Sequence, residues 1–312
     1  MRQAIGGIFL FFFALLCLLP LFLVNCQPKQ ADLTVRLYLK EEKKTITLTL
    51  EEYVKGVVAG EMPAHFHLEA LKAQAVAART VAVRRLKRFG GAGYPGTDAD
   101  LSDDVQDSQA WLNKKQLIAK WGLWGYYQNW SKIAAAVEAT AGLILTYNGE
   151  LIDALYHSTS GPRTANAEEV WGTPVPYLKS VPCSFDQHSP RYRQEQVFTV
   201  EALLSALGHG GKLPATALPL RVIDRTASGR VKTVQVGEKL YRGVEFRSRL
   251  GLASTNFTIH RQEDKVIVTT TGYGHGVGMC QYGADGLAKE GKTFQEILHY
   301  YYQGVEIRKL RF

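Results

Sequence analysis

The pattern of apolar and polar positions predicts a mixture of β-hairpins and helices. Residues 33–39 and 45–50 alternate apolar and polar side chains around the charged stretch KEEKK, which is typical of a β-hairpin. A second hairpin is predicted at Asn148–Gly149, the sequence favoured in two-residue turns. A helix is expected over 197–207, and several strands over 218–271. These elements do not form regular βαβ units.

The segment FHLEALKAQAVAARTVAVRRLKRFGG predicts one long helix. Its apolar stripe recurs at helical spacing and consists of Leu71, Ala75, Ala78, Ala82 and Leu86. Gly90–Gly91 ends the helix. Because alanine side chains are small, other backbone segments can approach this stripe closely, so we expect the helix to be buried. The predicted fold class is α+β, with hairpin-rich antiparallel sheets packed around this central Ala-rich helix.

The N-terminus predicts a further apolar helix. The run from Ile5 to Val24 has no charged residue and is roughly 20 residues long, enough to cross a hydrocarbon core. LVNC at Leu23–Cys26 resembles a bacterial lipobox. A lipoprotein, a cleaved signal and an uncleaved anchor all remain open. Each alternative predicts an extracytoplasmic protein, membrane-anchored or secreted, with residues 1–26 as leader, 27–32 as linker and 33–312 as the domain.

Composition narrows the choice of partners. The 312 residues are 46% hydrophobic, enough for a sizeable core, and the net charge of +8 favours anionic partners. The basic residues are scattered apart from RRLKR at Arg84–Arg88, and no aromatic–basic motif is present, which argues against nucleic acid. Cys183 and Cys280 are the only cysteines of the predicted domain, and a disulfide or two buried thiols are both open. No CxxC pair is present, so a structural zinc site lacks its strong signature. No metal and no cofactor are predicted.

Three short stretches carry candidate chemistry. Glu61 lies in the turn VVAGEMPAHF between two predicted helices, where partial desolvation raises the pKa of a carboxyl toward acid–base use. The stretch YHSTSGPRT suits a polar ligand through its hydroxyls. GYGHGVG contains His275 but lacks the features of a nucleotide-binding loop. Its glycines allow the backbone to approach a ligand or a neighbouring helix. Taken singly, each stretch is also compatible with a purely structural role.

Several motifs together resemble the stage II sporulation protein D/amidase-enhancer (SpoIID/LytB) family. They occur in the family's order: LEEYVKGVVAGEMPAHFHLEALKAQAVAARTVAV, SQAW, YHSTSGPRTANAEEVWGTPVPYLKSV, FRSRLGLASTNFTI and GYGHGVGMCQYGADGLAKEGKTFQEILHYYY. The resemblance extends from about Leu33 to Phe312. Tyr273, Cys280 and Pro162 depart from the residues usual in the family at these positions.

This resemblance implies peptidoglycan as the substrate. Sporulation members resemble lytic transglycosylases that cleave glycan strands stripped of their peptides, and the glutamate of the GEMP motif, here Glu61, is the implied catalytic acid. One carboxyl suffices because the muramic acid 6-hydroxyl replaces water and an anhydro sugar forms. The alternative is a non-catalytic, glycan-binding amidase enhancer that stimulates a partner hydrolase. A partner amidase or a membrane complex for wall remodelling is compatible with both.

The resemblance also implies a set of substrate-binding residues. They follow Glu61 on the predicted central helix or lie in the later motifs: Lys72, Gln74, Arg79, Gln109, Ser158, Thr159, Ser160, His275 and Gln281. Some clostridial members bind zinc just ahead of the glutamine. Here Ser102, Asp107 and Ser108 stand in place of those ligands, so no zinc site is expected in that segment.

Overall fold

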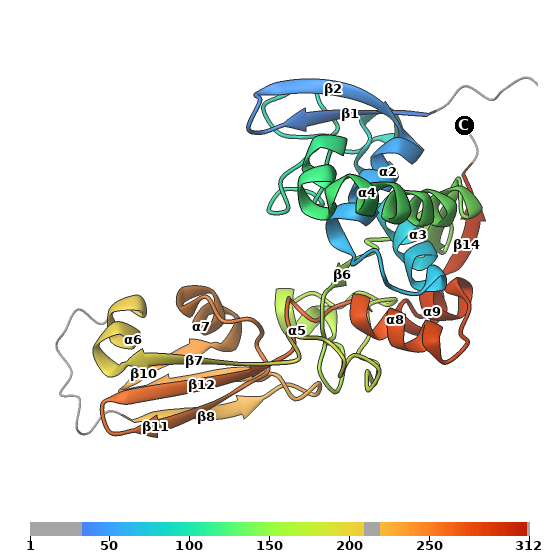
Figure 1. The fold of residues 1–312 in the computed structure, drawn as a ribbon. Coiled ribbons are helices and arrows are strands. Elements are labelled where there is room, and N and C mark those ends of the chain that lie inside the picture. The colour runs from blue at the N-terminus through green and yellow to red at the C-terminus, as the bar shows by residue number, and fades with distance from the viewer. Residues whose placement is uncertain (1–32, 209–218, 311–312) are drawn as a thin grey trace, which may run out of the picture. The chain divides into compact units, whose positions relative to one another are not determined.

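The α+β class is confirmed by a computed structural model (Figure 1), which describes residues 33–208 and 219–310. Val35–Phe312 form one compact unit. The predicted apolar helix over residues 5–24 lies outside the described residues. Among the helices of the described part, none is long and apolar enough to cross a membrane.

The predicted alanine-rich helix is α3 (Leu68–Arg85), and it is buried as expected. Its alanines, among them Ala73, Ala75 and Ala77, have no exposed surface. Glu69 in the first turn and Arg84 in the last turn complement the helix dipole. Mostly helices surround it: α2 (Leu50–Glu61), α4 (Lys114–Ala139), α8 (Gln281–Lys289) and α9 (Phe294–Tyr301), together with strand β4 (Leu143–Tyr147). Helices, more than the predicted sheets, therefore enclose the central helix.

Helix α2 ends at Glu61 for local reasons. A capping box between Thr49 and Glu52 starts the helix. Pro63 disfavours the helical region for the residue before it, and Met62 is extended, with φ −114° and ψ 146°. A Cβ on Gly60 would lie 2.7 Å from the carbonyl oxygen of Ala110, so a glycine lets the loop pack directly against the end of α2. Glu61 is thereby held next to this loop.

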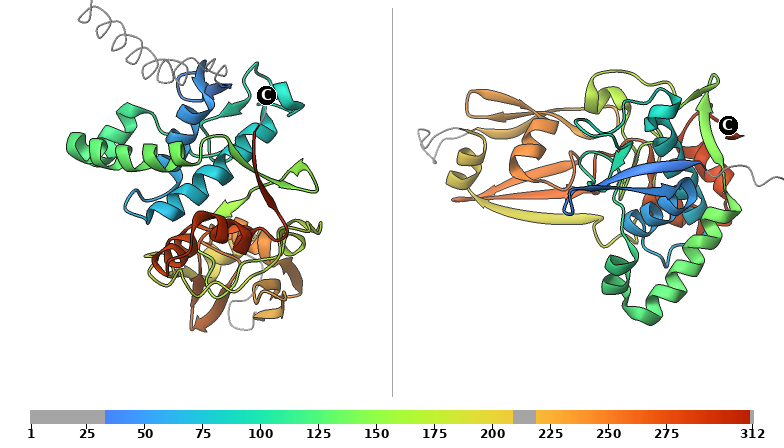
Figure 2. Two further views of the ribbon diagram at one scale, coloured as in Figure 1. Left: turned by 90° about the vertical axis from the view of Figure 1, so that its right-hand side faces the viewer. Right: turned by 90° about the horizontal axis from the view of Figure 1, so that it is seen from above.

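Helix α4 consists of two helical pieces that meet at Gly122. Its N-terminus is fixed by a capping box between Asn113 and Gln116. Gly122 has φ 70° and ψ 169°, a conformation that interrupts the helix and suits glycine. Figure 2 shows the change of direction along this green helix. The kink separates a short first piece from a longer second piece, and α4 as a whole packs on α2 and α3.

Both predicted hairpins are present. Strands β1 (Thr34–Leu39) and β2 (Lys44–Thr49) are neighbours in one sheet, and β3 (Leu101–Ser102) joins β1 in parallel. Strand β4 pairs with β5 (Glu150–Leu151) and with β14 (Glu306–Lys309), both antiparallel. Asn148 and Gly149 have φ of 52° and 87°, as a type I′ turn requires.

Two antiparallel sheets and two helices share a separate apolar core. One sheet contains β11 (Phe257–Gln262), β12 (Lys265–Thr271) and β7 (Arg193–Thr199), and the other contains β10 (Lys239–Arg242), β9 (Val231–Val236) and β8 (Leu220–Arg225). Helices α6 (Val200–Ala206) and α7 (Gly243–Leu250) contribute to the same core. The helix predicted from residue 197 begins only at Val200, because strand β7 extends to Thr199, whose side chain caps α6.

A short parallel pair connects segments that are far apart in the sequence. Strand β6 (Tyr156–His157) pairs with β13 (Met279–Cys280), in the register Met279 to Tyr156. Together with β1–β3 this is a departure from the predicted antiparallel sheets. Helix α5 (Ala167–Trp171) and the 3₁₀ turn Lys87–Phe89 complete the described elements. The pairing brings the glycine-rich loop beside the HSTSG segment.

Candidate active site

A cleft of about 720 Å³ is formed where these segments meet. Its wall includes the end of α2 with the GEMP turn, part of α4, strand β6, the glycine-rich loop and the start of α8. Of the predicted site residues, four line the cleft: Glu61, Ser158, His275 and Gln281. Glu61 is the only carboxylate among the lining residues in the described part of the chain.

The Glu61 carboxyl is largely buried and is held by the neighbouring loop. The backbone N–H of Ala110 donates to Glu61 Oε1 at 2.8 Å. Burial raises the pKa of Glu61, and this effect is partly offset by hydrogen bonds from Ala110, Tyr156 and Gln281. A carboxyl with a raised pKa and an opening to a cleft can hold a proton and give it to a bound ligand.

Tyr156 connects Glu61 with Gln109 behind the cleft wall. The single proton of the Tyr156 hydroxyl has two acceptors within reach, Gln109 Oε1 at 2.8 Å and the Glu61 carboxylate, and Gln109 Nε2 donates to the Tyr53 hydroxyl at 3.2 Å. Burial, followed by the charge of Glu61, raises the pKa of Tyr156 well above its usual value, so the hydroxyl keeps its proton. Gln109 thus positions Tyr156 and does not itself line the cleft. Sequence reasoning missed Tyr156, although it directly precedes the HSTSG motif.

Gln74 and Gln281 link the central helix to α8. Gln281 Nε2 lies 3.4 Å from Gln74 Oε1, and the Gln74 side chain is fully buried. Gln281 lines the cleft and hydrogen-bonds with Glu61, whereas Gln74 lies behind it. The pair thereby places one amide beside the carboxyl from the α8 side.

Three glycines of GYGHGVG, Gly272, Gly274 and Gly278, are needed for contact with the segment 155–160, and Gly276 lies against the Arg230 side chain. Gly272, Gly274, Gly276 and Gly278 all have positive φ, a conformation that L side chains rarely adopt. A Cβ on Gly278 would lie 2.0 Å from the Leu155 carbonyl oxygen. The bare backbone therefore packs against this segment, and the approach to a neighbouring helix that the sequence suggested is not what these contacts show.

His275 is fixed through both ring nitrogens. The backbone N–H of Val277 donates to Nδ1 at 3.1 Å, so Nε2 carries the proton and donates to the Tyr156 carbonyl oxygen at 3.1 Å. Burial lowers the pKa of His275 to about 4. The imidazole is consequently neutral at pH 7 and has no free nitrogen for proton transfer. It faces the cleft as a ring and contacts the Trp171 ring at a centroid distance of 5.4 Å.

The three hydroxyls of the HSTSG segment have different surroundings. Ser158 lines the cleft. Thr159 and Ser160 are buried: Thr159 Oγ1 hydrogen-bonds to Ser189 Oγ at 2.7 Å, and Ser160 Oγ to His157 Nε2 at 2.7 Å. Of the three, only Ser158 is in a position to contact a ligand in the cleft.

The two cations predicted on the central helix do not line the cleft. Lys72 Nζ forms an ion pair with Glu69 at 2.6 Å. Arg79 is fully buried, pairs with Glu51 at 2.6 Å and donates to the Leu143 carbonyl oxygen at 3.1 Å. These contacts give Arg79 a structural task, the connection of α3 with the start of α2 and with β4.

Two other cations line the cleft instead. Arg191 stacks on the Tyr273 ring, with its guanidinium carbon 4.2 Å from the ring centroid. Lys120 Nζ donates to the Ala59 carbonyl oxygen at 3.2 Å. Sequence reasoning missed both. Lys120 precedes the aromatic stretch WGLWGYY, which is a usable signal, whereas Arg191 lies in a loop without any local pattern.

The comparisons with known proteins agree with the motifs. The family model SpoIID, described as "Stage II sporulation protein", matches residues 38–147. The chain is 42% identical to stage II sporulation protein D of Bacillus subtilis (strain 168) over 279 residues, which are 89% of this chain and 80% of that protein. Stage II sporulation protein D of Bacillus amyloliquefaciens gives the same identity and coverage.

A more distant relative has a different name. The amidase enhancer of Bacillus subtilis (strain 168) is 28% identical over 306 residues, which are 81% of this chain and 40% of that longer protein. The matches to stage II sporulation protein D cover most of both chains at an identity that establishes common descent, so the chain belongs to the SpoIID family.

Proposed function

We propose that the protein is an extracytoplasmic peptidoglycan lytic transglycosylase that cleaves peptide-stripped glycan strands, with Glu61 as its single acid and base. The observation that carries this proposal is the lone carboxylate of the cleft. Glycosidases that use water need two carboxyl groups, one as acid and one as base or nucleophile. Among the described lining residues of this cleft, Glu61 has no acidic partner.

A single carboxyl can perform both proton transfers of the reaction. Protonated Glu61 gives its proton to the glycosidic oxygen as the bond from this oxygen to muramic acid C1 breaks. The resulting carboxylate then accepts the proton of the muramic acid 6-hydroxyl, whose oxygen bonds to C1. The product is a 1,6-anhydromuramyl end, and Glu61 is protonated again. The raised pKa of Glu61 favours the proton-carrying form that begins the cycle.

The charge of the cleft supports a substrate without peptide stems. Lys120 and Arg191 are lining cations, and Glu61 is the only lining carboxylate in the described residues. In an intact strand the lactyl carboxyl of muramic acid is joined to the peptide by an amide. Removal of the peptide frees this carboxylate, which then complements the two cations.

The second candidate is a glycan-binding accessory protein that stimulates a separate hydrolase. The 28% identity to the amidase enhancer favours it. It requires the cleft to hold a strand without cleaving it, so Glu61 would then serve binding only.

The test is mass spectrometry of peptide-free glycan strands incubated with the full chain. We expect anhydromuramyl products from the native protein, none from Glu61→Gln, and native amounts from the matched control Glu150→Gln, whose exposed side chain lies at the start of β5. Strand binding without product by the native chain would leave the accessory role. If Glu61→Gln gave as much anhydromuramyl product as the native protein, Glu61 would not be the catalytic acid.

A further inference from the structure

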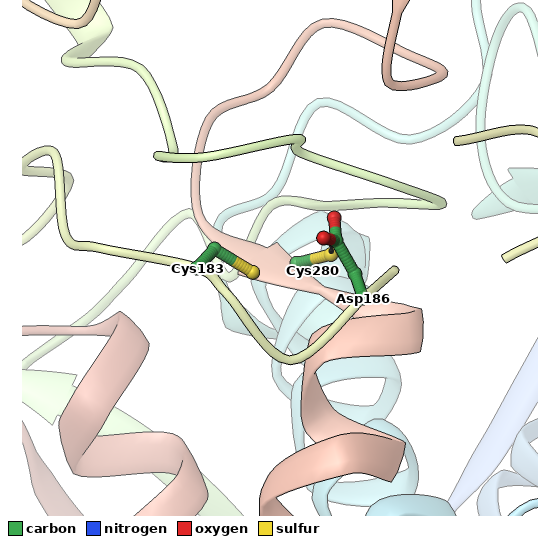
Figure 3. A group of neighbouring side chains, drawn as sticks. All are labelled: Cys183, Asp186 and Cys280. Atoms are coloured by element: carbon green, nitrogen blue, oxygen red, sulfur yellow. Dashed lines mark hydrogen bonds between the residues drawn. The ribbon is translucent and has the colours of Figure 1, made fainter. Parts of the chain in front are cut away.

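A cluster of two cysteine thiols and one carboxylate lies outside the cleft. Cys183 and Asp186 belong to the loop between α5 and β7, and Cys280 ends β13 and caps α8. All three side chains are fully buried. One possible ligand atom of each lies within 4.8 Å of the others, and no other group of this kind is found in the described residues. Figure 3 shows the two sulfur atoms and the carboxylate converging.

One oxygen of this group has no hydrogen-bond partner. Asp186 Oδ2 accepts from the backbone N–H groups of Ser160 at 2.7 Å and Gly161 at 2.9 Å, and the Cys280 thiol donates to it at 3.4 Å. Asp186 Oδ1 is buried and has no donor. A buried carboxylate oxygen without a partner has lost its hydrogen bonds to water, and no protein hydrogen bond offsets this cost. A cation bound in the cluster would supply the missing interaction.

A hydroxyl oxygen is available as a further donor. His157 Nδ1 lies 3.1 Å from the Val277 carbonyl oxygen, which only accepts, so Nδ1 carries the proton of the neutral ring. Nε2 then accepts the Ser160 hydroxyl proton at 2.7 Å. Ser160 is also within hydrogen-bonding reach of both thiols. With its proton directed to His157, the lone pairs of Ser160 Oγ are free to face the sulfur atoms.

We propose that Cys183, Asp186 and Cys280 bind one thiophilic divalent cation of the zinc type, with Ser160 Oγ nearest the fourth position. Zinc binds thiolates at about 2.3 Å and carboxylate oxygens at about 2.1 Å, which places neighbouring donors about 3.5 to 3.8 Å apart. The observed group needs only small side-chain shifts to reach this spacing. Two thiolates disfavour magnesium and calcium, which prefer oxygen.

Metal binding releases two protons and links two segments of the chain. The two thiol protons pass to solvent, and the contact between the Cys280 thiol and Asp186 is replaced by bonds to the metal. The cation then fastens the loop around residue 186 to the N-terminus of α8, directly before Gln281. This inference does not depend on the proposed enzymatic activity.

The experiment measures zinc per chain by mass spectrometry and cobalt(II) binding by the near-ultraviolet thiolate-to-cobalt absorption. Both use the full chain with Cys17→Ser and Cys26→Ser, so that only the two buried thiols remain. We expect one zinc per chain and a cobalt–thiolate band. Cys280→Ser should abolish both, and Asp186→Asn should weaken zinc binding at least tenfold. Asp224→Asn, an exposed aspartate paired with Lys232, is the matched control and should bind normally.

Folding of each variant is checked by circular dichroism. Asn at position 186 still offers an oxygen to the Ser160 and Gly161 N–H groups, so this variant remains informative if Cys280→Ser does not fold. A folded parent without zinc and without a cobalt–thiolate band would overturn the proposal. It would equally be overturned if neither thiol reacted after denaturation without reductant, because the pair would then be a disulfide.

Discussion

Glu61 and His275 face the same cleft and respond to burial in opposite directions. Burial raises the pKa of the carboxyl and lowers that of the imidazole to about 4, because in both cases the charged form is disfavoured. The difference lies in their bonding. Both nitrogens of His275 are taken by backbone groups, whereas Glu61 is held by one backbone N–H and by side chains at an open cleft. Glu61 differs from His275 less in its burial than in its hydrogen bonds. The Glu61 carboxyl can still exchange a proton with a ligand in the cleft, whereas both nitrogens of His275 are occupied.

The largest expected effect is on the cleavage rate, which should depend on Glu61. Glu61→Gln should lower the cleavage rate by roughly a thousandfold, since general acid–base catalysis contributes about 10² to 10⁴. The temperature of unfolding should be unchanged or higher, because an uncharged amide replaces a desolvated carboxyl. Activity on peptide-free strands and thermal unfolding at pH 7 measure the two effects. Loss of stability with unchanged activity would reverse the roles assigned here.

The second effect concerns stability and pH. The folded pKa of His275 lies below its usual value of 6.5, so its contribution is complete above pH 6.5 and is lost as pH falls toward about 4. A shift of this size corresponds to about 3 kcal/mol of unfolding free energy. Denaturant unfolding of native protein and His275→Gln between pH 7 and 4 should show a smaller dependence on pH for the variant. Identical slopes for both proteins would remove His275 as the titrating group.

A smaller effect on activity is expected from Tyr156, which contacts both Glu61 and His275. Its hydroxyl hydrogen-bonds with Glu61 and lowers the pKa of that carboxyl, while its carbonyl oxygen accepts from His275. Tyr156→Phe removes the hydroxyl's contacts with Glu61 and Gln109 and keeps the carbonyl contact with His275. We therefore expect the alkaline limb of the pH–rate profile to move to higher pH, with a loss of activity of about tenfold. A shift toward lower pH would contradict the assigned contact.

The smallest effect tests binding. Arg191→Ala should raise KM about three- to tenfold for strands with free lactyl carboxylates and leave kcat nearly unchanged, because it removes a charge contact that takes no part in the proton transfers. Arg193→Ala, on the exposed start of β7, is the matched control. An equal rise in KM for strands that retain their peptides would show that Arg191 does not recognise the carboxylate.

Local patterns predicted much of the fold but less of the cleft. The hairpins, the buried α3 and the end of α2 before Pro63 follow from alternation, alanine spacing and the properties of proline. The pairing of β6 with β13 could not be predicted, because two-residue strands carry no periodicity. Tyr156 belongs to such a strand, Lys120 lies in the long helix α4 and Arg191 lies in a loop, and none of the three was identified from the sequence. Their place in the cleft depends on tertiary contacts between distant segments.

The chain from β7 to β12 is an excursion with a consequence for how this protein can vary. The two ends of this β7–β12 segment lie side by side. The Gly272 N–H donates to the Tyr192 carbonyl oxygen at 2.8 Å, and Arg193 pairs with Thr271. The chain thus leaves and returns at one point, and the sheets beyond it have an apolar core of their own. We expect that such an excursion can be lengthened, shortened or exchanged as a module while the geometry of the cleft at its base is preserved.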